Sequence, residues 1–371
     1  MKILFVVNVD WFFISHRLPL AEEALRRGLD VYLITKDTGY FENLSTYGIK
    51  CFNLDFERSG KNPFKEFLLV IKLYNFYKSI NPDIIHHVTL KPSIYGTLAA
   101  KTMKNNFRII NAVSGLGYTF TANRVSISKI ILKIIMKIAY SSKKVNFIFQ
   151  NPDDKYLYKK LGFLNNNNNV IIRGAGVDEN KFLLKKRKTT KDINVVLLAR
   201  MLKDKGVFEF ISAANLLKDQ FKNKIKFILV GGIDEFNPAG ISANQLNSLC
   251  DGEYILWVGH QKNVMDIYEN ADIVCLPSYR EGLPKSLVEA MAKGCPIITT
   301  DAIGCRECVI DNVNGFLVPI GDHQLLAEKI KFLATNDNIR TEMGMQSRKI
   351  MLDEMSLSKV VKMTFDFYFQ A

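Results

Sequence analysis

The chain has 371 residues, 48% of them hydrophobic and 23% charged, which is an ordinary balance for a globular protein of about two domains. No apolar run approaches the roughly 20 residues that span a bilayer, and the first residues lack the pattern of a secretory signal, so we expect a cytoplasmic protein. The six cysteines do not combine with histidines in a zinc-type spacing, which argues against a disulfide framework and a zinc site.

Short apolar runs alternate with helical patterns along the first half of the chain. The runs cover residues 3–9, 31–35, 84–88 and 108–113, and a helical pattern over 14–27 follows the first of them. Strands that are apolar on both faces and are joined by helices indicate a parallel sheet covered on both sides. The first half therefore predicts a doubly wound α/β domain.

Positive charge is concentrated in this half. The net charge is +13, and residues 1–165 hold 24 lysines and arginines against 12 acidic residues, whereas residues 166–371 hold 26 against 25. Residues 101–150 contain nine basic residues and no acidic one. Such a face attracts anions, among them phospholipid head groups, diphosphates and nucleic acid.

A helix is predicted over residues 126–140, within this basic stretch. Lys129, Lys133 and Lys137 recur every four residues on one side of it, and most other positions are isoleucine, leucine, methionine or alanine. This pattern is typical of a helix that lies at a membrane surface. A core helix with a solvated lysine face gives the same pattern, and the sequence leaves both interpretations open.

The asparagine run at 165–169 follows Leu161 and Gly162, which are typical of a helix end. We interpret the run as a structureless polar segment. It predicts an N-terminal domain over residues 1–165 and a C-terminal domain over residues 166–371.

The alternation of strands and helices restarts in the second half, and the segment from residue 339 onward is helical by composition. Two successive doubly wound units without a detectable repeat predict two Rossmann-like domains that face a central cleft. Packing of the last helix back on the first domain is left open by the sequence. The strand-like runs lie at 195–199, 227–230, 254–258, 273–276 and 297–299.

Ligands of open α/β sheets bind at the carboxyl ends of the strands, so the loops after the apolar runs are candidate sites. One such loop places Arg200 directly after a strand, and Lys205 and Gly206 follow at the expected start of a helix. Two cations and the free N–H groups of a helix start together form a site for a diphosphate. Two solvated surface cations are the alternative.

Paired glycines, Gly231 and Gly232, end the next strand. Because glycine has no side chain, the pair lets a ligand approach the backbone closely, although an ordinary turn at a strand end uses glycine as well. The pair is therefore a candidate contact for the same ligand.

The strongest candidate is the loop over residues 277–290. Gly282 frees the turn, and Pro284 suits the first position of a helix. Glu281 then lies in the loop and Glu289 about one turn into the helix. Carboxylates accept hydrogen bonds from sugar hydroxyls, and the N–H groups of the helix start hold phosphate oxygens, so one loop offers both contacts that a nucleotide sugar needs. A solvent-facing helix with two acidic residues is the alternative.

Several common nucleotide and metal motifs are missing from the sequence. There is no GxxxxGK[ST] loop and no GxGxxG fingerprint, because 115–117 and 174–176 both lack the third glycine. No Asp-x-Asp pair occurs, so we expect neither a metal ion nor a cofactor. Arg200 and Lys205 are expected to take the place of a metal beside the diphosphate.

Together these loops resemble glycosyltransferase family four. The resemblance rests on Arg200 and Lys205, on the glycine pair after residues 227–230, and on Glu281 and Glu289 with seven residues between them. It covers essentially the whole chain and is closest to bacterial transferases that extend polyprenyl-diphosphate-linked oligosaccharides. It implies a GT-B fold and a retaining, metal-independent transfer of an N-acetylhexosamine such as N-acetylgalactosamine from a UDP-sugar.

The resemblance also implies roles for individual residues. Arg200 and Lys205 hold the diphosphate, Glu281 binds the donor sugar, Glu289 binds the ribose, and the loop near Val264 receives the uracil. The further donor contacts that we expect are Gly231, Gly232, Gly282, Leu283 and Ser286.

For the N-terminal domain, the resemblance implies a polyprenyl-diphosphate-linked saccharide as acceptor. The expected setting is the cytoplasmic face of the inner membrane, where the basic half of the chain meets anionic lipids. Related enzymes build the repeats of O-antigen and capsule, so we expect a role in the assembly of a bacterial surface polysaccharide.

The sequence departs from the family in two loops. Residues 114–117 read Ser-Gly-Leu-Gly where many members carry a His-Gly pair, so the role of that histidine cannot be assigned to a residue of this sequence. The first loop lacks the usual paired glycines and instead places His16 and Arg17 at the expected opening of the first helix, as candidates for a phosphate or the acceptor. Lys91, after the run at 84–88, is a candidate for the acceptor diphosphate or else a solvated cation.

Two other functions fit parts of the sequence. A UDP-sugar epimerase shares the two-domain architecture, but it gives no reason for the basic helix at 126–140. A non-catalytic binder of the membrane surface would use the basic face alone. No helix-turn-helix or aromatic RNA-binding motif indicates nucleic acid, so we expect no nucleic-acid partner.

Overall fold

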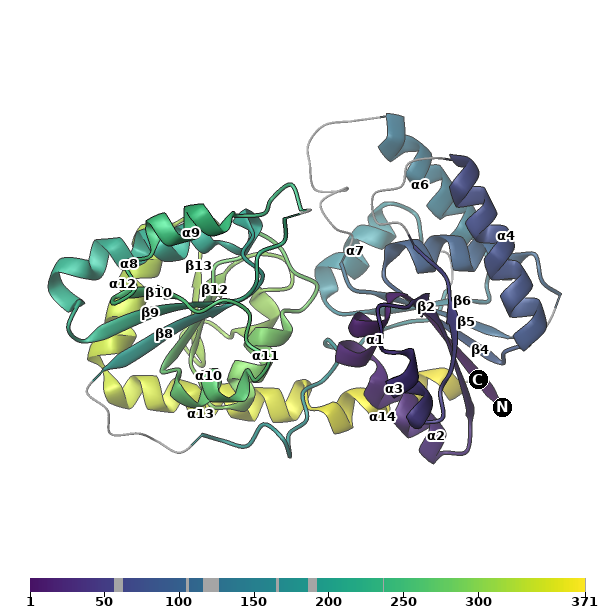
Figure 1. Cartoon of the computed structure of the whole chain (residues 1–371). Coiled ribbons are helices and arrows are strands. Elements are labelled where there is room, and N and C mark those ends of the chain that lie inside the picture. The colour runs from purple at the N-terminus through teal and green to yellow at the C-terminus, as the bar shows by residue number, and fades with distance from the viewer. Residues whose placement is uncertain are drawn as a thin grey trace. The chain divides into compact units, whose positions relative to one another are not determined.

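The computed structural model describes residues 1–56, 63–104, 107–115, 127–164, 167–185, 192–235 and 237–370, which form two compact units (Figure 1). Unit 1 consists of Met1–Ala175 and Val360–Ala371, and unit 2 of Gly176–Lys359. The division thus falls after Ala175 instead of at the expected residue 165, and the end of the chain packs with unit 1.

Unit 1 is built on a parallel sheet of seven strands in the order β3-β2-β1-β4-β5-β6-β7. The strands are β1 (Lys2–Val9), β2 (Asp30–Lys36), β3 (Lys50–Asn53), β4 (Ile84–Val88), β5 (Arg108–Val113), β6 (Val145–Phe149) and β7 (Asn169–Ile171). Successive side chains of a strand point to opposite faces, so Leu4 and Val6 pack in one core and Phe5 packs in the other. This explains why the strands read as continuous apolar runs.

Helices cover both faces of this sheet (Figure 1). Leu73 of α4 and Met136 of α6 pack in one core, whereas Leu20 of α2 and Phe365 of α14 pack in the other. The helices of the unit are α1 (Asp10–His16), α2 (Leu18–Arg26), α3 (Phe41–Thr46), α4 (Pro63–Ile80), the π-helix η1 (Pro92–Gly96), α5 (Thr97–Lys101), α6 (Ile127–Tyr140), α7 (Pro152–Lys160) and, from Val360 on, α14 (Leu357–Phe369).

The expected helix over residues 14–27 is two helices that meet at Arg17. α1 begins at Asp10, directly after β1, and ends at His16. Pro19 lies in the first turn of α2, where its missing N–H costs no helical hydrogen bond. A helix that continued from α1 would need that N–H, so α1 ends before Pro19. His16 therefore ends α1, and Arg17 lies between the two helices as the last cap of α1 and the first cap of α2. The expectation that the pair opens the first helix is wrong, because that helix begins at Asp10.

The asparagine run is not a structureless segment over its described part. Asn167 is buried, and its amide donates to the backbone oxygens of Ser142 (3.0 Å) and Val145 (2.8 Å). Asn169 begins β7. A polar side chain can enter the interior when backbone oxygens accept its protons, which composition alone does not reveal. The first two residues of the run, 165 and 166, lie outside the described residues.

Unit 2 has a parallel sheet of six strands in the order β10-β9-β8-β11-β12-β13. The strands are β8 (Ile193–Leu198), β9 (Ile225–Val230), β10 (Ile255–Trp257), β11 (Ile273–Leu276), β12 (Ile297–Thr300) and β13 (Gly315–Val318). The helices are η3 (Lys203–Lys205), α8 (Val207–Phe221), α9 (Ala243–Leu249), α10 (Met265–Asn270), α11 (Lys285–Ala292), η4 (Arg306–Cys308), α12 (His323–Thr335) and α13 (Asp337–Glu354). The prediction of two doubly wound parallel-sheet units is confirmed.

In each sheet the strand order reverses beside the first strand, between β1 and β4 in unit 1 and between β8 and β11 in unit 2. Ligands of doubly wound sheets bind outside the carboxyl ends of the strands at such a switch point. The loops that follow these four strands are therefore the places where chemistry is expected. Within the described part of the chain, none of the helices is long and apolar enough to cross a membrane.

Candidate functional site

The switch point of unit 2 brings Lys205 and Glu281 together. Lys205 ends η3, after β8, and Glu281 lies in the loop after β11. Lys205 Nζ lies 2.5 Å from Glu281 Oε1, and the two side chains are only 16% and 14% exposed. Ser278 Oγ donates to the same carboxylate oxygen at 2.9 Å. A cation and a hydroxyl thus fix one oxygen of a shielded carboxylate and leave its other oxygen as a further acceptor.

A glycine makes this approach of two loops possible. Gly206 has φ of 74°, and a Cβ atom there would lie 2.1 Å from the carbonyl oxygen of Pro277. Next to it, the backbone N–H of Tyr279 donates to Asp204 O at 2.9 Å. Ser278 Oγ lies 3.0 Å from the same oxygen, which is an alternative acceptor for the one hydroxyl proton that Glu281 also accepts. These contacts lock the β8 loop onto the β11 loop and hold Lys205 against Glu281.

Arg200 lies in the loop after β8 and pairs with a residue of the loop after β9. Its Nη1 atom lies 2.7 Å from Asp234 Oδ2, and the arginine side chain is 53% exposed. Gly231 lets the two loops meet, because a Cβ atom there would lie 1.7 Å from Ala199 O, and the N–H of Met201 donates to Gly232 O at 3.0 Å. Arg200 is therefore accessible to an anion, while Asp234 balances its charge.

Tyr268 of α10 gathers three of the expected donor contacts. Its hydroxyl lies 3.1 Å from Glu289 Oε2 and 2.9 Å from the backbone oxygen of Ser286, which are two acceptors for its one proton, and its N–H donates to Val264 O at 3.1 Å. Lys285 Nζ lies 3.7 Å from Glu289 Oε1. Glu289 is 8% exposed, and this burial raises its pKa.

The start of α11 differs slightly from the expected one. Pro284 is the residue before the first helical position, so the helix begins at Lys285. Gly282 and Leu283 form the turn before it, and Leu283 packs against the core of unit 2. The N–H of Glu281 donates to Ile303 O at 2.9 Å, which fixes the loop to the segment after β12.

The expected residues of unit 1 do not form a comparable group with one another. His16 stacks on Phe12 with 4.0 Å between ring centroids, and its Nδ1 lies 3.3 Å from Phe12 O. Arg17 is 5% exposed, and burial lowers its pKa to about 10. Its Nη1 donates to His16 O at 2.8 Å, and Tyr368 of α14 lies close enough to act on its charge. This setting favours a structural role for Arg17 over contact with a ligand.

Lys91 follows β4 and is held by Glu66 of α4. Lys91 Nζ lies 2.7 Å from Glu66 Oε1, and the two side chains are 19% and 16% exposed. The alternative of a solvated Lys91 is therefore wrong. Of the loop where the family carries a histidine, Ser114 and Gly115 are described and residues 116 and 117 lie outside the described residues.

Four residues of these groups were not predicted from the sequence. Ser278 and Asp234 lie in loops that were singled out, so their position after a strand was an available signal. Tyr268 and Glu66 lie on α10 and α4, and nothing in their sequence surroundings sets them apart. Only the folded chain brings them to the other members of their groups.

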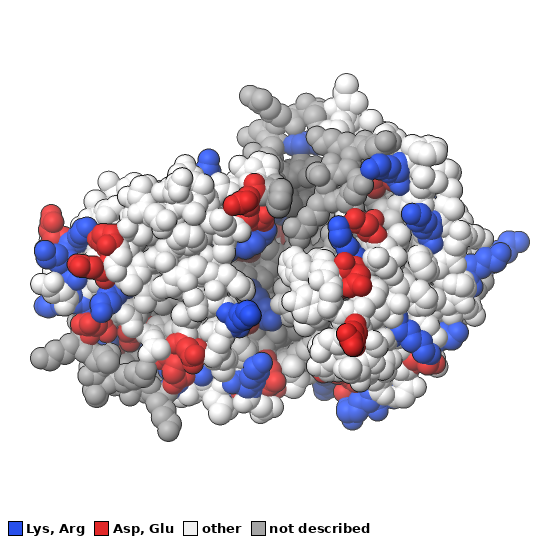
Figure 2. Space-filling model, in the orientation of Figure 1, with Lys and Arg blue, Asp and Glu red and all other residues white. Residues whose placement is uncertain are grey.

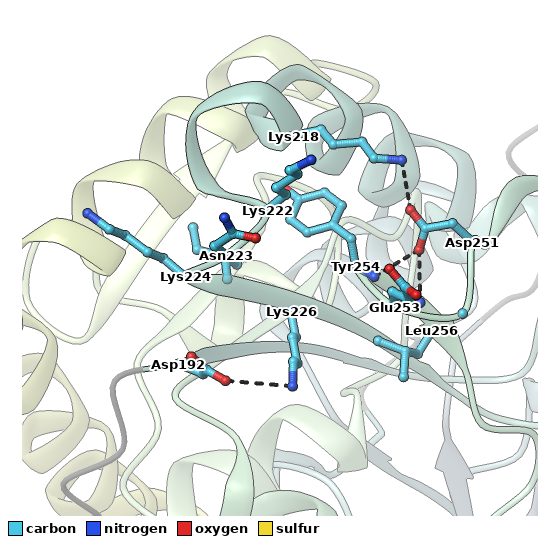
Figure 3. A pocket seen from close by; sticks show the side chains of 12 residues that line it. Asp192, Lys218, Lys222, Asn223, Lys224, Lys226, Asp251, Glu253, Tyr254 and Leu256 are labelled. Carbon is cyan, nitrogen blue, oxygen red and sulfur yellow. Dashed lines mark hydrogen bonds and ion pairs between the residues drawn. The ribbon is translucent and has the colours of Figure 1, made fainter.

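A cavity of about 740 Å³ lies at the opposite edge of the unit 2 sheet, where β8 and β9 begin (Figure 3). Its charged side chains are largely occupied with each other, because Lys218 pairs with Asp251 at 2.7 Å and Lys226 pairs with Asp192 at 3.6 Å. This is the amino-terminal edge, away from the place where ligands of open sheets bind. We do not assign the cavity to the candidate site.

Two doubly wound units, one of which carries paired cations and carboxylates at the carboxyl edge of its sheet, define a nucleotide-sugar glycosyltransferase of the GT-B class. Residues 177–350 match the family described as "Glycosyl transferases group 1", and residues 2–151 match "Glycosyl transferase 4-like". The chain belongs to glycosyltransferase family four, as its relatives also indicate.

One relative, from Campylobacter jejuni, is 30% identical over 358 residues, which cover 93% of this chain and 92% of the relative. It is an N,N'-diacetylbacillosaminyl-diphospho-undecaprenol alpha-1,3-N-acetylgalactosaminyltransferase. An Escherichia coli relative, a UDP-Gal:alpha-D-GlcNAc-diphosphoundecaprenol alpha-1,3-galactosyltransferase, is 23% identical over 349 residues, or 91% of this chain and 88% of the relative.

Solved structures share the fold of the whole chain. A glycosyltransferase from Rickettsia africae superposes with a TM-score of 0.79 at 18% identity, covering 99% of this chain and 97% of that one. The Anabaena protein HepE in complex with UDP superposes with a TM-score of 0.76 at 18% identity, covering 99% of both chains. The GT-B fold predicted from the sequence is confirmed.

Proposed function

We propose that this chain is a retaining glycosyltransferase that moves an N-acetylhexosamine, such as N-acetylgalactosamine, from a UDP-sugar to a polyprenyl-diphosphate-linked saccharide. The observation that carries the proposal is the shielded group of Lys205, Glu281 and Ser278 at the switch point of unit 2. The activities of the Campylobacter and Escherichia relatives, both of which act on diphospho-undecaprenol-linked sugars, support the acceptor class.

In the proposed reaction, the acceptor hydroxyl oxygen forms a bond to the anomeric carbon on the face from which UDP leaves. The bond from that carbon to the diphosphate oxygen breaks, and the acceptor proton passes to the departing diphosphate. Charge that develops on the leaving group is the main barrier, so cations placed beside it lower that barrier most. Arg200, Lys205 and the N–H groups at the start of α11 are suited to this role.

Glu281 is suited to the donor sugar. One of its carboxylate oxygens is held by Lys205 and Ser278, which fixes its orientation. A fixed carboxylate accepts hydrogen bonds from sugar hydroxyls with little loss of entropy on binding. Glu289 is suited to the ribose in the same way, because Tyr268 and Lys285 hold its carboxylate beside the start of α11.

The exposed face of α6 supports action at a membrane. Met136, Ala139 and Tyr140 are the buried residues of this helix. A row of isoleucines points away from the core: Ile127, Ile130, Ile131, Ile134 and Ile138 are 78%, 50%, 51%, 52% and 53% exposed. A core helix would bury such a row, so this pattern favours the membrane-surface interpretation over the core-helix alternative.

α4 adds to this apolar surface. Phe64 and Phe67 are 68% and 61% exposed, on a helix that covers the same face of the sheet as α6. Figure 2 shows basic side chains separated by uncharged surface on the part of unit 1 that holds α4. Apolar side chains between lysines fit the interface of an anionic bilayer, which we propose to be the cytoplasmic face of the inner membrane.

The test is release of UDP from a panel of UDP-sugars, with and without a polyprenyl-diphosphate-linked sugar. We expect acceptor-dependent release from one UDP-N-acetylhexosamine and a glycosylated lipid as product. Release of no UDP from any donor would overturn the proposal. Conversion of UDP-N-acetylglucosamine to an isomer, without acceptor, would favour an epimerase instead.

A further inference from the structure

A flexible point of the backbone lies directly after Lys205. The short helix η3 ends at Lys205, α8 begins at Val207, and Gly206 joins them with a left-handed φ of 74°. Glycine adopts this conformation without strain and restricts the backbone less than other residues do. The direction in which the Lys205 side chain leaves the loop therefore depends on contacts that hold η3 and α8 in one arrangement.

Tyr279, in the loop after β11, makes contacts on both sides of this flexible point. Its backbone N–H donates to Asp204 O at 2.9 Å, on the η3 side. Its hydroxyl donates to Glu209 Oε1 at 2.7 Å, in the first turn of α8. One residue thus holds the two segments that flank Gly206, and Lys205 lies between its two contacts. We call these two hydrogen bonds the Tyr279 clamp.

The hydroxyl bond of the clamp joins a neutral donor to a charged acceptor, and such bonds are roughly twice as strong as bonds between neutral groups. The hydrogen bond to Glu209 raises the pKa of Tyr279 to about 12, so the hydroxyl keeps its proton and remains a donor. Glu209 Oε2 is buried and has no hydrogen-bond partner among the described residues. A carboxylate shielded in this way is destabilised when it loses a donor, which favours the closed clamp.

The β11 loop is itself fixed to the rest of the sheet, so it can serve as the support for Lys205. Thr300 of β12 is buried, and its hydroxyl donates to Ser278 O. The N–H of Glu281 donates to Ile303 O at 2.9 Å, in the segment after β12. The clamp therefore connects a firmly held loop to the flexible one that carries the lysine.

We propose that Tyr279 and Glu209 are positioning residues, which fix η3 relative to α8 and so hold Lys205 Nζ at Glu281. The tyrosine hydroxyl is engaged by Glu209, so the pair acts through Lys205 and not on the substrate. This assignment rests on the proposed function, in which Lys205 stabilises the charge of the departing diphosphate. Loss of the clamp then lowers the rate of the chemical step more than it weakens binding of the donor, because the misplaced cation is needed most in the transition state.

Initial-rate kinetics of the full chain test this, with the UDP-sugar varied. Tyr279→Phe removes only the hydroxyl, and Glu209→Ala removes its acceptor, so we expect each to lower kcat about tenfold and to leave the KM for the UDP-sugar within about threefold of wild type. Glu209→Gln should restore most of the rate, because its amide oxygen still accepts the hydroxyl proton.

Tyr254→Phe is the matched control for these variants. Its hydroxyl also donates one hydrogen bond, to Ala214 O at 3.0 Å, but Tyr254 lines the cavity at the opposite edge of the sheet (Figure 3). The control should leave kcat unchanged. An unchanged kcat in Tyr279→Phe would overturn the assignment.

A second comparison distinguishes positioning from a general contribution to stability. In a Lys205→Ala chain there is no cation left to position, so adding Tyr279→Phe should lower kcat further by less than about twofold. A hydroxyl that only stabilises unit 2 would act equally in both backgrounds. A tenfold loss of kcat in each of the two backgrounds would therefore overturn the assignment.

Hydrogen exchange separates the clamp from the proposed function. The N–H of Gly206 donates to Lys203 O at 3.2 Å and that of Tyr279 donates to Asp204 O at 2.9 Å, so these two amides report on the clamp without turnover. Both should exchange at least about fivefold faster in Tyr279→Phe and at the wild-type rate in Tyr254→Phe. Unchanged exchange in Tyr279→Phe would overturn the clamp even if the enzyme transfers sugar. Faster exchange in a chain that transfers no sugar would uphold the clamp and reject the proposed function.

Discussion

The two units share one architecture, and each pairs a cation with a carboxylate after a strand, but they differ in the polar atoms that are left without a partner. At the switch point of unit 2, cations and carboxylates are paired within the protein, as in Lys205 with Glu281 and Arg200 with Asp234. At the switch point of unit 1, the oxygens of Asn8 and Thr89 are buried without a partner among the described residues. Unit 1 also contains the residues 1–165 that carry most of the excess positive charge.

The difference indicates two kinds of ligand. Paired charges with a shielded centre suit a compact, highly charged ligand that can exchange one ionic partner for another. Unpaired acceptors, surface lysines and exposed aromatic and aliphatic side chains suit a ligand that is partly sugar, partly phosphate and partly hydrocarbon.

The largest effect is expected in unit 2. Lys205→Ala removes a cation beside the proposed leaving group, so kcat/KM should fall by about 10² to 10³. Glu281→Ala should lower it to a similar extent, and circular dichroism should show an intact fold in both. Lys203→Ala, an exposed lysine two residues earlier in η3, is the control. Near-normal rates in Lys205→Ala would mean that the pair is structural and that the units do not differ as described.

Acid should affect unit 1 before unit 2. Burial lowers the pKa of His87 in β4 to about 4, from an ordinary value of 6.5, and it lowers that of His86 as well. A base with a depressed pKa contributes stability that is complete above pH 6.5 and is lost as the pH falls toward 4, here roughly 3 kcal/mol for His87. Hydrogen exchange should therefore show faster opening of β4 and β5 at pH 4.5 than at pH 7, with a smaller change in β8 and β11. Equal changes in the two sheets would contradict this.

The exposed isoleucines of α6 should matter for membranes and not for chemistry. Ile130→Ser combined with Ile134→Ser removes two apolar side chains from the proposed interface, so binding to anionic vesicles should weaken by at least about tenfold. The rate with a short-chain, water-soluble acceptor should not change. Leu216→Ser in α8 of unit 2, at a leucine that is 55% exposed, is the control. If the double variant binds vesicles as tightly as wild type, the isoleucines do not contribute to membrane binding and the basic charge alone causes it.

The smallest effect concerns the stability of unit 2. Burial raises the pKa of Glu289, so its ionised form costs free energy of folding at pH values above its ordinary range. Glu289→Gln keeps the shape and removes the charge, and the variant should therefore melt at a slightly higher temperature than wild type at pH 8. At pH 4, where the wild-type carboxyl is largely protonated, the difference should vanish. A variant that melts lower at pH 8 would show that the carboxylate stabilises the fold.

The parts of the fold that the sequence predicted are those with a strong local signal. The runs at 84–88, 108–113 and 273–276 coincide with β4, β5 and β11, because these strands are buried over almost their whole length. Strands β3, β6, β7 and β13 were not predicted. The side chains of β3 and β7 are only partly buried and show no apolar run, whereas β6 and β13 are largely buried but short. The helix break at Arg17 was readable in principle from Pro19.

The residues of the candidate sites also divide into those with a local signal in the sequence and those without one. Arg200 and Glu281 lie in loops directly after strands, and Lys205 ends the short helix η3 that follows β8, so their placement at one edge of the sheet follows from the rule that parallel strands share a carboxyl edge. Glu66 and Tyr268 lie on helices, and their partners depend on packing that has no local signal. For α6, the helix itself was predictable, but the outward direction of its isoleucines depends on which face the rest of unit 1 covers.

The pair between Lys205 and Glu281 has a consequence for the end of the catalytic cycle. If Lys205 holds the diphosphate as proposed, UDP competes with Glu281 for its charge once the sugar has left, because Lys205 Nζ lies 2.5 Å from Glu281 Oε1. Such an internal counter-ion would then weaken the hold on the spent nucleotide. We therefore expect Glu281→Gln to slow the departure of UDP and to make inhibition by this product stronger.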